Sequence, residues 1–345
     1  MDKKNILLIL TGGTICSFST KKGEQASDTE KAQTLIVHNF KNSTSPYRDN
    51  VEFHCVSPLD ILSENMTVAH WDSLIKAIKT YDLSSYDGVI ILHGTDTLAY
   101  TSALLSVLLA GSPVPVILVS SQLPIYNENA NGNANFKAAV ELIVNGIKPN
   151  IYAVYRNEEN GADRAMYIHY AAHLVQCGRN SNNFYSSTMS PISSENAVFE
   201  GRSSNRNKML VHEEGFTGLF ACVLKIEPYT GIDYSKYSLD GVDAILHGTY
   251  HSYTIPTDTS NERNSILYLK KLCDEHLPKI SLFIEPCPKT IYETTGTALR
   301  NGIMPLSDLT SEMAYAKTII GCSMGLSGAE LLDFINTEIN EEFLK

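Results

Sequence analysis

The chain has 345 residues, of which 43% are hydrophobic, so it can bury one or two complete cores. It carries 27 basic and 38 acidic residues with no long basic run, which argues against a nucleic-acid partner because phosphate binding needs clustered Lys and Arg. The apolar stretch before Thr11 is too short for a signal peptide, no segment reaches the length of a membrane span, and no CxxC pair occurs. A cytoplasmic protein with reduced thiols is therefore expected.

The first half of the chain alternates between strand and helix patterns. Short, β-branched apolar runs typical of strands buried on both faces occur at residues 6–10, 51–56, 89–92, 114–119 and 151–155. Helices are predicted between them: one capped by Thr67, one from about Thr97 to Gly111, and one from Asn135 to about Val144. This alternation predicts a doubly wound α/β domain with a mainly parallel sheet.

The second half predicts a linker and a smaller α/β domain. Ser, Asn, Glu and Arg dominate from about Ser181 to Glu214, where apolar periodicity disappears. We expect an N-terminal catalytic domain at 1–185, a linker at 186–214 and a second domain at 215–345. The second domain has strand patterns at 220–226, 242–246 and 280–284, with helical patterns at 266–273 and 311–320.

Two of the predicted strands end in turns that carry hydroxyl groups. Thr11-Gly12-Gly13-Thr14 follows the first strand, and His93-Gly94-Thr95-Asp96-Thr97 follows the third. Ligands of open parallel sheets bind beyond the carboxyl ends of the strands. The two turns therefore predict a crevice with hydroxyls, one carboxylate and backbone N–H groups, which suits a small, charged substrate.

Each feature of these turns has a simpler interpretation. The Gly12-Gly13 turn matches neither GxGxxG nor GxxxxGK[ST], which argues against a nucleotide site. Thr14 is either a reactive hydroxyl or a helix cap. Asp96 is either a cap or the partner of a substrate ammonium, a pair worth about 4 kcal/mol at about 4 Å before desolvation. His93, at the end of a buried strand, is interpreted as a core histidine rather than a base.

A third pattern is the spacing of His169, His173 and Cys177, which would place them on one face of a helix. Such a stripe can bind zinc. However, no acidic residue accompanies the histidines as in HExxH, and tyrosines and a leucine fill the same stretch. We therefore predict no metal site.

Together, residues 10–15 (LTGGTI) and 92–98 (LHGTDTL) resemble the two signatures of the bacterial-type L-asparaginase family. Residues 63–67, 119–124 and 244–252 are similar to further segments of that family, so the resemblance spans nearly the whole chain. The expected N-terminus, without a signal peptide, is similar to the cytoplasmic type I enzymes. The resemblance implies hydrolysis of L-asparagine to L-aspartate and ammonia through an acyl-enzyme, without a cofactor or metal.

The resemblance also implies roles for individual residues. Thr14 is the expected nucleophile, Thr95 the second essential hydroxyl, and Asp96 the partner of the substrate α-ammonium. The remaining expected substrate-binding residues are Ser63 at the α-carboxylate, Glu64 where the family has Gln or Ser, and Gly13 and Ser120. The family implies a homodimer or homotetramer in which a neighbour's second domain completes each site.

Two departures from the family pattern affect the predicted catalysis. Alignment of residues 161–167 places Tyr167 where the family has a proton-relay lysine. A phenol with a pKa near 10 can pass a proton but supplies no cation, so Arg164, Lys21 and Lys22 are alternative sources of charge. In addition, residues 19–28 lack the family's loop tyrosine, and Phe18 is the nearest aromatic residue. The alternatives to an asparaginase are a binding protein without turnover and an amidase that acts on glutamine or a larger amide.

Overall fold

The computed structural model describes residues 3–20, 24–158, 165–192, 201–204, 206–285 and 292–344. The chain divides into two compact units, Met1–Glu214 with Ile339–Glu341, and Gly215–Glu338 with Glu342–Lys345. The stretch 186–214, expected as a linker, lies within the first unit and contributes a strand, β11 (Ser190–Ile192), to its sheet. Among the described helices, none has the length and apolar character needed to span a bilayer.

The first unit contains a seven-stranded sheet with the order β11-β8-β7-β6-β5-β1-β4. Five strands are parallel: β1 (Lys4–Leu10), β4 (Val51–Val56), β5 (Gly88–Leu92), β6 (Val116–Val119) and β7 (Ile151–Arg156). β8 (Met166–Tyr170) and β11 add an antiparallel edge. The five predicted strands are confirmed, with ends that shift by one or two residues. The order places the topological switch point between β1 and β5, where ligands of doubly wound sheets bind.

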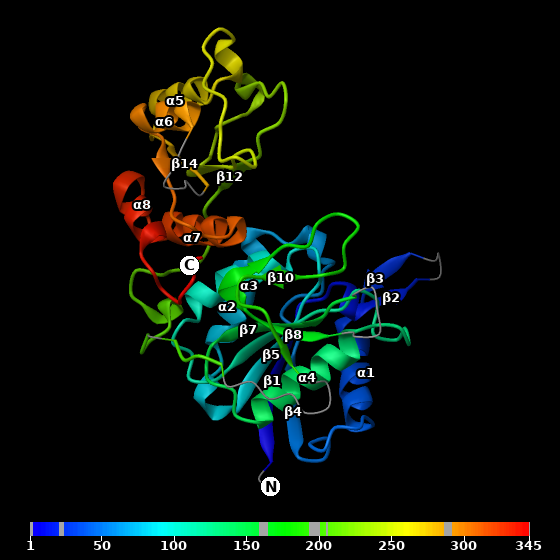
Figure 1. Cartoon of the computed structure of the whole chain (residues 1–345). Helices are drawn as coiled ribbons and strands as arrows, with labels where there is room; N and C mark the ends of the chain where they lie inside the picture. The colour runs from blue at the N-terminus through cyan, green and yellow to red at the C-terminus, as the bar shows by residue number, and fades with distance from the viewer. Residues whose placement is uncertain are drawn as a thin grey trace. The chain divides into compact units, whose positions relative to one another are not determined.

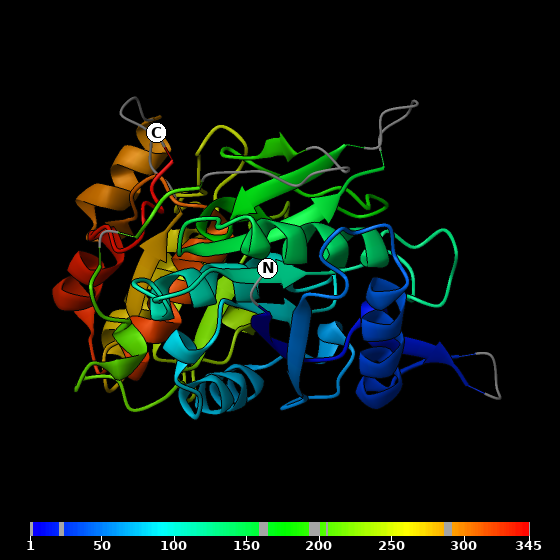
Figure 2. The ribbon, with the colours of Figure 1, turned by 90° about the horizontal axis from the view of Figure 1, so that it is seen from below.

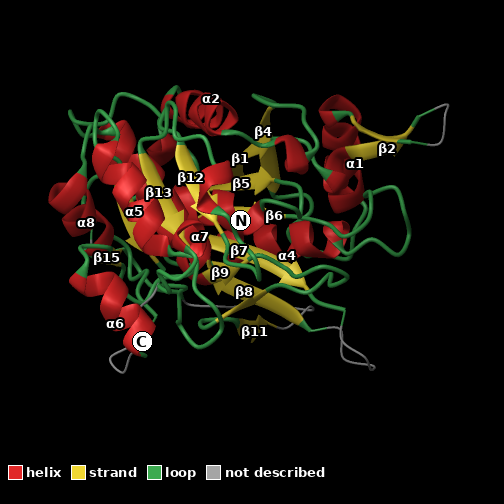
Figure 3. Cartoon of the chain, turned by 90° about the horizontal axis from the view of Figure 1, so that it is seen from above, coloured by secondary structure: helices red, strands yellow, loops and turns green. Residues whose placement is uncertain are grey.

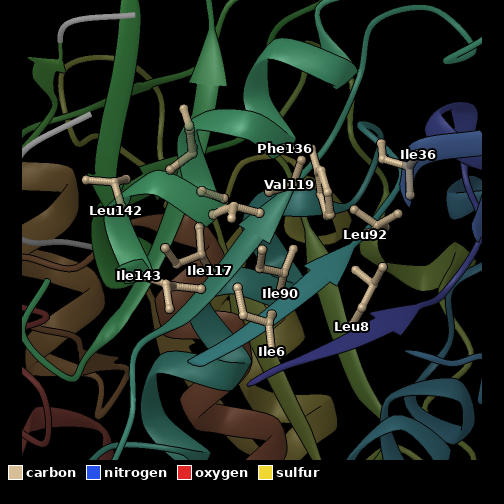
Figure 4. Packing of buried hydrophobic residues seen from close by; sticks show 14 of the residues in the cluster. Ile6, Leu8, Ile36, Ile90, Leu92, Ile117, Val119, Phe136, Leu142 and Ile143 are labelled. Atoms are coloured by element: carbon tan, nitrogen blue, oxygen red, sulfur yellow. The ribbon is translucent and has the colours of Figure 1, made fainter. Parts of the chain in front are cut away.

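Alternate residues of the central strands point to opposite faces of the sheet, and both faces are buried. One face packs under α1 (Thr29–Lys41) and α4 (Gly132–Val144), and Figure 4 labels this layer: Ile6, Leu8, Ile90, Leu92, Ile117 and Val119 from the sheet, with Ile36, Phe136, Leu142 and Ile143 from the helices. α3 (Leu98–Leu108) lies on the other side of the sheet in Figure 1. Burial on both faces explains why these strands are almost entirely apolar.

The predicted helices are confirmed, and their ends follow known capping rules. The Thr67 hydroxyl accepts a hydrogen bond from the His70 N–H at the start of α2 (Val68–Lys79). α3 ends just before Gly111, whose φ is 86°. The sequence did not predict helix α1, the antiparallel strands β8 and β11, or the hairpin of β2 (Ser17–Ser19) and β3 (Gln25–Ser27), which extends from the first unit in Figure 2.

The second unit is built on a four-stranded parallel sheet with the order β12-β13-β14-β15. Its strands are β12 (Val223–Ile226), β13 (Ala244–His247), β14 (Ser281–Ile284) and β15 (Met304–Pro305). Helices α5 (Ile266–Glu275) and α7 (Ser311–Ser323) pack against these strands, as Figure 3 shows. The predicted second α/β domain is confirmed, whereas β15, α6 (Glu293–Arg300) and α8 (Gly328–Asn336) were not predicted.

The helix proposed for His169, His173 and Cys177 is wrong. His169 lies in β8, His173 ends a short 3-10 turn (Ala171–His173), and Cys177 follows β9 (Leu174–Val175). β9 pairs with β10 (Tyr185–Ser186), and His169 Nδ1 lies 2.9 Å from the Ser186 hydroxyl. Within the described ranges, no group of three or more His, Cys, Asp or Glu side chains could hold a metal ion.

Candidate active site

Three turns meet at the switch point between β1 and β5. A Cβ atom added to Gly13 would lie only 2.2 Å from the Gly94 Cα, and one added to Gly94 would lie 2.3 Å from the Ser63 hydroxyl. Gly13 also has a φ of 79°, which residues other than glycine rarely adopt. The absence of a side chain at both glycines therefore allows the Thr14, Ser63 and Thr95 segments to pack together.

Backbone hydrogen bonds fix these turns to one another. The Thr11 N–H donates to the Leu92 carbonyl at 3.1 Å, and the Gly13 N–H donates to the Ile61 carbonyl at 2.6 Å. The Thr97 hydroxyl donates to the Ser63 carbonyl at 3.0 Å. The segments after β1, β4 and β5 thus form one connected wall, so their side chains are held at defined positions.

Ser63 and Asp96 form a reciprocal pair within this wall. The Ser63 hydroxyl donates to Asp96 Oδ2 at 3.1 Å and accepts from the Asp96 N–H at 3.2 Å. Ser63 is buried, whereas the Asp96 side chain is exposed. Thr97, and not Asp96, is the N-cap residue of α3. The Asp96 carboxylate is therefore oriented by Ser63 and exposed to solvent.

Thr14 begins a short 3-10 turn (Thr14–Cys16) directly after the two glycines and is half-buried. Cys16, the nearby alternative nucleophile, is fully buried, and burial raises the pKa of its thiol to about 12. Cys16 is therefore a neutral thiol at pH 7 and not a nucleophilic thiolate. Of these two side chains, Thr14 is the one that is not fully buried.

His93 has the geometry of a structural histidine, as predicted. It is fully buried, and its Nδ1 lies 2.8 Å from the Gly94 carbonyl, which can only accept, so Nδ1 carries the proton. Burial lowers its pKa to about 4. A neutral His93 therefore holds the turn that carries Thr95 and Asp96.

A pocket of about 300 Å³ adjoins the second turn. Thr95 and Asp96 form part of its wall, and the segment 176–182 between β9 and β10 supplies most of the remainder. Gln176 connects the two walls: its Nε2 donates to the Thr95 carbonyl at 2.8 Å, and its Oε1 accepts from the Ala99 N–H at 3.2 Å. Gln176 thus fixes the Thr95 turn to the start of α3, a role that no sequence motif indicated.

Tyr167, the residue predicted to replace a relay lysine, lies on β8 of the first unit's sheet. Tyr167 is half-buried on β8, where it pairs with Tyr155 of β7 and Pro191 of β11. The side chain of Gln176, nine positions later, donates a hydrogen bond to the Thr95 carbonyl. The helix-like spacing in 169–177 predicted a helix where the chain forms short strands. The contact between Gln176 and Thr95 was therefore not predicted. Lys21, Lys22 and Arg164 lie outside the described residues.

The other expected substrate-binding residues differ in exposure. Glu64 is exposed in a 3-10 turn (Ser63–Asn65). Ser120 is fully buried after β6, and its hydroxyl has no hydrogen-bond partner among the described residues. Near the first loop, the ring of Phe18 stacks on Tyr126 with centroids 5.5 Å apart, and the Tyr126 hydroxyl contacts the Ser19 hydroxyl. Tyr126 therefore places a phenol beside the hairpin that lacks a tyrosine of its own.

The fold and the hydroxyl-bearing turns at its switch point are those of an α/β enzyme of the amidohydrolase class, and comparison with known proteins defines the family. Residues 5–211 match the family model described as "Asparaginase, N-terminal". The chain belongs to the asparaginase family.

Relatives of the chain include both amidotransferases and asparaginases. A glutamyl-tRNA(Gln) amidotransferase component from Methanococcus maripaludis (strain C6) is 27% identical over 330 residues, which cover 91% of this chain and 75% of that protein. L-asparaginase 1 of Escherichia coli (strain K12) is 34% identical over 146 residues, 42% of each chain. The crystal structure of L-asparaginase I from Vibrio cholerae has the same fold, with a TM-score of 0.71 and 22% identity over 99% of this chain and 100% of that one.

Proposed function

We propose that this protein hydrolyses L-asparagine to L-aspartate and ammonia, with Thr14 as the nucleophile. The observation that carries the proposal is the contact between the Gly13 and Gly94 backbones, which brings the Thr14 and Thr95 turns to one crevice. The exposed Asp96 carboxylate beside it is complementary to an α-ammonium group. The similarity to L-asparaginase 1 supports the same substrate.

In the proposed reaction, the Thr14 hydroxyl oxygen attacks the side-chain amide carbon, and its proton is transferred by way of Thr95 to the leaving nitrogen. The C–N bond breaks, ammonia leaves, and an ester joins Thr14 to the aspartyl group. Water then attacks this ester, which releases aspartate and restores the Thr14 hydroxyl.

Backbone N–H groups would stabilise the oxyanion of each tetrahedral intermediate. The Gly13 N–H already donates to Ile61, and the Asp96 N–H donates to Ser63. Neither is therefore free for this task, which leaves the N–H groups of Thr14 and Thr95 as the proposed donors. Removal of one such donor typically costs about 10²–10³ in kcat, so small shifts of either turn should be detectable.

Ammonia release from L-asparagine by the wild type and by Thr14→Ala tests the proposal. We expect the wild type to be active and Thr14→Ala to lose at least 1000-fold in kcat, with Thr34→Ala, an exposed hydroxyl on α1, as the unaffected control. Intact-mass spectrometry of acid-quenched protein should detect the acyl group on Thr14. Activity that survives in Thr14→Ala, or an adduct on another residue, would reject Thr14 as the nucleophile.

The amide of glutamine is a second candidate substrate. It is favoured by the similarity to an amidotransferase component over 91% of this chain. The two substrates differ by one methylene, and one methylene changes the free energy of binding in a pocket by only about 1–3 kcal/mol. Comparison of kcat/KM for both amides therefore decides the substrate, and tight binding of either without ammonia release would indicate a binding protein.

A further inference from the structure

His173 and Ser187 form a hydrogen-bonded pair, and neither residue lines the pocket beside Thr95. His173 ends the 3-10 turn that follows β8, and Ser187 directly follows β10. His173 Nδ1 lies 3.0 Å from the Ser187 hydroxyl oxygen, and His173 Nε2 lies 2.7 Å from the Glu341 carbonyl oxygen. All three residues belong to the first unit. A hydroxyl, an imidazole and a carbonyl are thus joined in series by two hydrogen bonds.

These two contacts define the tautomer of His173. A carbonyl oxygen can only accept a hydrogen bond, so the Nε2 that contacts Glu341 carries the proton. A neutral imidazole has a single N–H group, so Nδ1 is an acceptor and the Ser187 hydroxyl donates to it. The arrangement therefore has the three parts of an activated nucleophile: a hydroxyl, a base that can take its proton, and a group that orients the base.

The carbonyl that orients His173 comes from a residue in an unusual backbone conformation. Glu341 has a φ of 55°, in the left-handed region that residues other than glycine rarely adopt. The neighbouring Asn340 Nδ2 donates to the Ser106 carbonyl at 3.0 Å, and Arg202 Nη1 donates to Glu341 Oε2 at 3.0 Å. Strained conformations of this kind persist where the surrounding structure fixes them. The Glu341 carbonyl, and with it the His173 ring, is therefore held in a defined orientation.

A second serine–histidine pair lies beside the first and lacks these properties. His169 Nδ1 lies 2.9 Å from the Ser186 hydroxyl, but its Nε2 is buried without a hydrogen-bond partner among the described residues. Burial lowers the pKa of His169 to about 3, so this imidazole accepts a proton poorly at pH 7. Ser186 is half-buried, whereas Ser187 is exposed. Of the two pairs, that of Ser187 combines an accessible hydroxyl with an oriented base.

We propose that Ser187 is a second nucleophile of this protein, activated by His173, and that it accepts the acyl group of small activated esters. The Ser187 oxygen attacks the ester carbonyl carbon while its proton passes to His173 Nδ1. The bond between this carbon and the leaving oxygen then breaks, the leaving oxygen takes the proton from His173, and the acyl group stays esterified to Ser187. Water attacks this ester by the same route, which frees the carboxylic acid and restores the hydroxyl. The reaction requires neither Thr14 nor an amide.

Reaction of the protein with p-nitrophenyl acetate tests the proposal. Release of p-nitrophenol measures acyl transfer, and peptide mapping by mass spectrometry after acid quenching locates the acetyl group. We expect Ser187 to be acetylated at least 100-fold faster than Ser186, because general-base catalysis contributes about 10²–10⁴-fold. His173→Gln should lower the rate of Ser187 acetylation at least 100-fold, and Ser187→Ala should remove this modification. Ser186→Ala is the matched control and should leave the rate at Ser187 unchanged.

A second variant separates loss of the base from loss of the fold. His173 is buried, so His173→Gln is first checked by circular dichroism and thermal melting. Ser187→Cys places a thiol at the same exposed position, where His173 should promote its ionisation. We expect iodoacetamide to alkylate this thiol at least tenfold faster than the exposed Cys222 of the same chain.

Three outcomes would overturn the proposal. The first is a wild-type protein in which Ser187 is not acetylated or reacts no faster than Ser186. The second is a folded His173→Gln variant that acetylates Ser187 at the wild-type rate. The third, which decides the matter where His173→Gln does not fold, is a thiol in Ser187→Cys that reacts no faster than Cys222. None of these measurements involves ammonia release, so they are independent of the proposed action on L-asparagine.

Discussion

The hydroxyl of Ser63 and the carboxylate of Asp96 form a closed pair in which each residue donates to the other. The pair joins the turn after β4 to the turn after β5 and directs a carboxylate into the crevice. Because Ser63 is buried and Asp96 is exposed, the serine is inaccessible to bulk water while its partner faces solvent. Ser63 is thus a positioning residue for Asp96.

Ser63→Ala should therefore weaken substrate binding by releasing the Asp96 carboxylate. Hydrogen bonds to charged groups contribute about 1.5–3 kcal/mol, which corresponds to a rise in KM of roughly tenfold or more. Initial-rate kinetics at fixed pH measures this rise, with kcat expected to change less. Ser73→Ala, on the exposed face of α2, should leave KM unchanged. An unchanged KM in Ser63→Ala would show that Asp96 needs no partner.

The contact between the Gly13 and Gly94 backbones gives a second prediction. Gly13→Ala would place a Cβ 2.2 Å from the Gly94 Cα, at a φ of 79°. We expect loss of activity together with destabilisation by roughly 2–4 kcal/mol, from backbone strain and overpacking. Gly146→Ala is a matched control, because Gly146 has nearly the same φ, 80°, but open space around it. It should cost only about 1 kcal/mol and leave activity intact.

Urea denaturation and ammonia release, measured on both glycine variants, check this prediction. The difference in destabilisation between the two variants measures the cost of the close approach, separately from the cost of the positive φ. Equal destabilisation in the two would mean that the turn after β1 moves aside at little cost.

Local patterns predicted the five parallel strands of the first unit and three of the four parallel strands of the second, because buried strands of parallel sheets are largely continuous apolar runs. They also predicted the two threonine turns, since glycine next to a strand end marks a turn in the sequence itself. Gln176 could not be found in this way. Its position depends on a pairing between β9 and β10 and on contacts with residues about 80 positions earlier, which no local spacing records.

Helix α1 could have been predicted. Ala32, Ile36 and Phe40 are four residues apart and all are buried, and Asp28 caps the helix by accepting from the Lys31 N–H. In contrast, the helix predicted at 169–177 was wrong because a spacing of four residues also occurs by chance where the chain forms strands of two and five residues.

Gln176 gives a third prediction, on the positioning of Thr95. Gln176→Leu removes both hydrogen bonds, to the Thr95 carbonyl and from the Ala99 N–H, so we expect kcat to fall about tenfold or more with a smaller change in KM. Gln176→Glu keeps the acceptor for Ala99 but loses the donor to Thr95, and it should recover stability but not kcat. Gln33→Leu on α1 is the control. If Gln176→Glu has wild-type kcat, the bond to Thr95 has no catalytic consequence.

Two buried histidines give a prediction on pH. His93 directly follows β5 and His247 ends β13. Each bonds through Nδ1 to the carbonyl of the following glycine, and burial lowers the pKa of each to about 4. In the unfolded chain both would titrate near 6.5. Between these values the unfolded state binds more protons, so stability is complete above about pH 6.5 and falls as the pH drops towards 4.

At pH 5 each of these histidines should reduce the free energy of unfolding by about 2 kcal/mol relative to pH 8. Urea titrations at the two pH values measure the loss. His93→Gln should be less stable at pH 8 because a buried contact changes, but its stability should depend less on pH, since one buried imidazole no longer resists protonation. His251→Gln, an exposed histidine, should keep the wild-type dependence. A variant at His93 with the full wild-type pH dependence would mean that this imidazole is protonated as readily in the folded protein as in the unfolded chain.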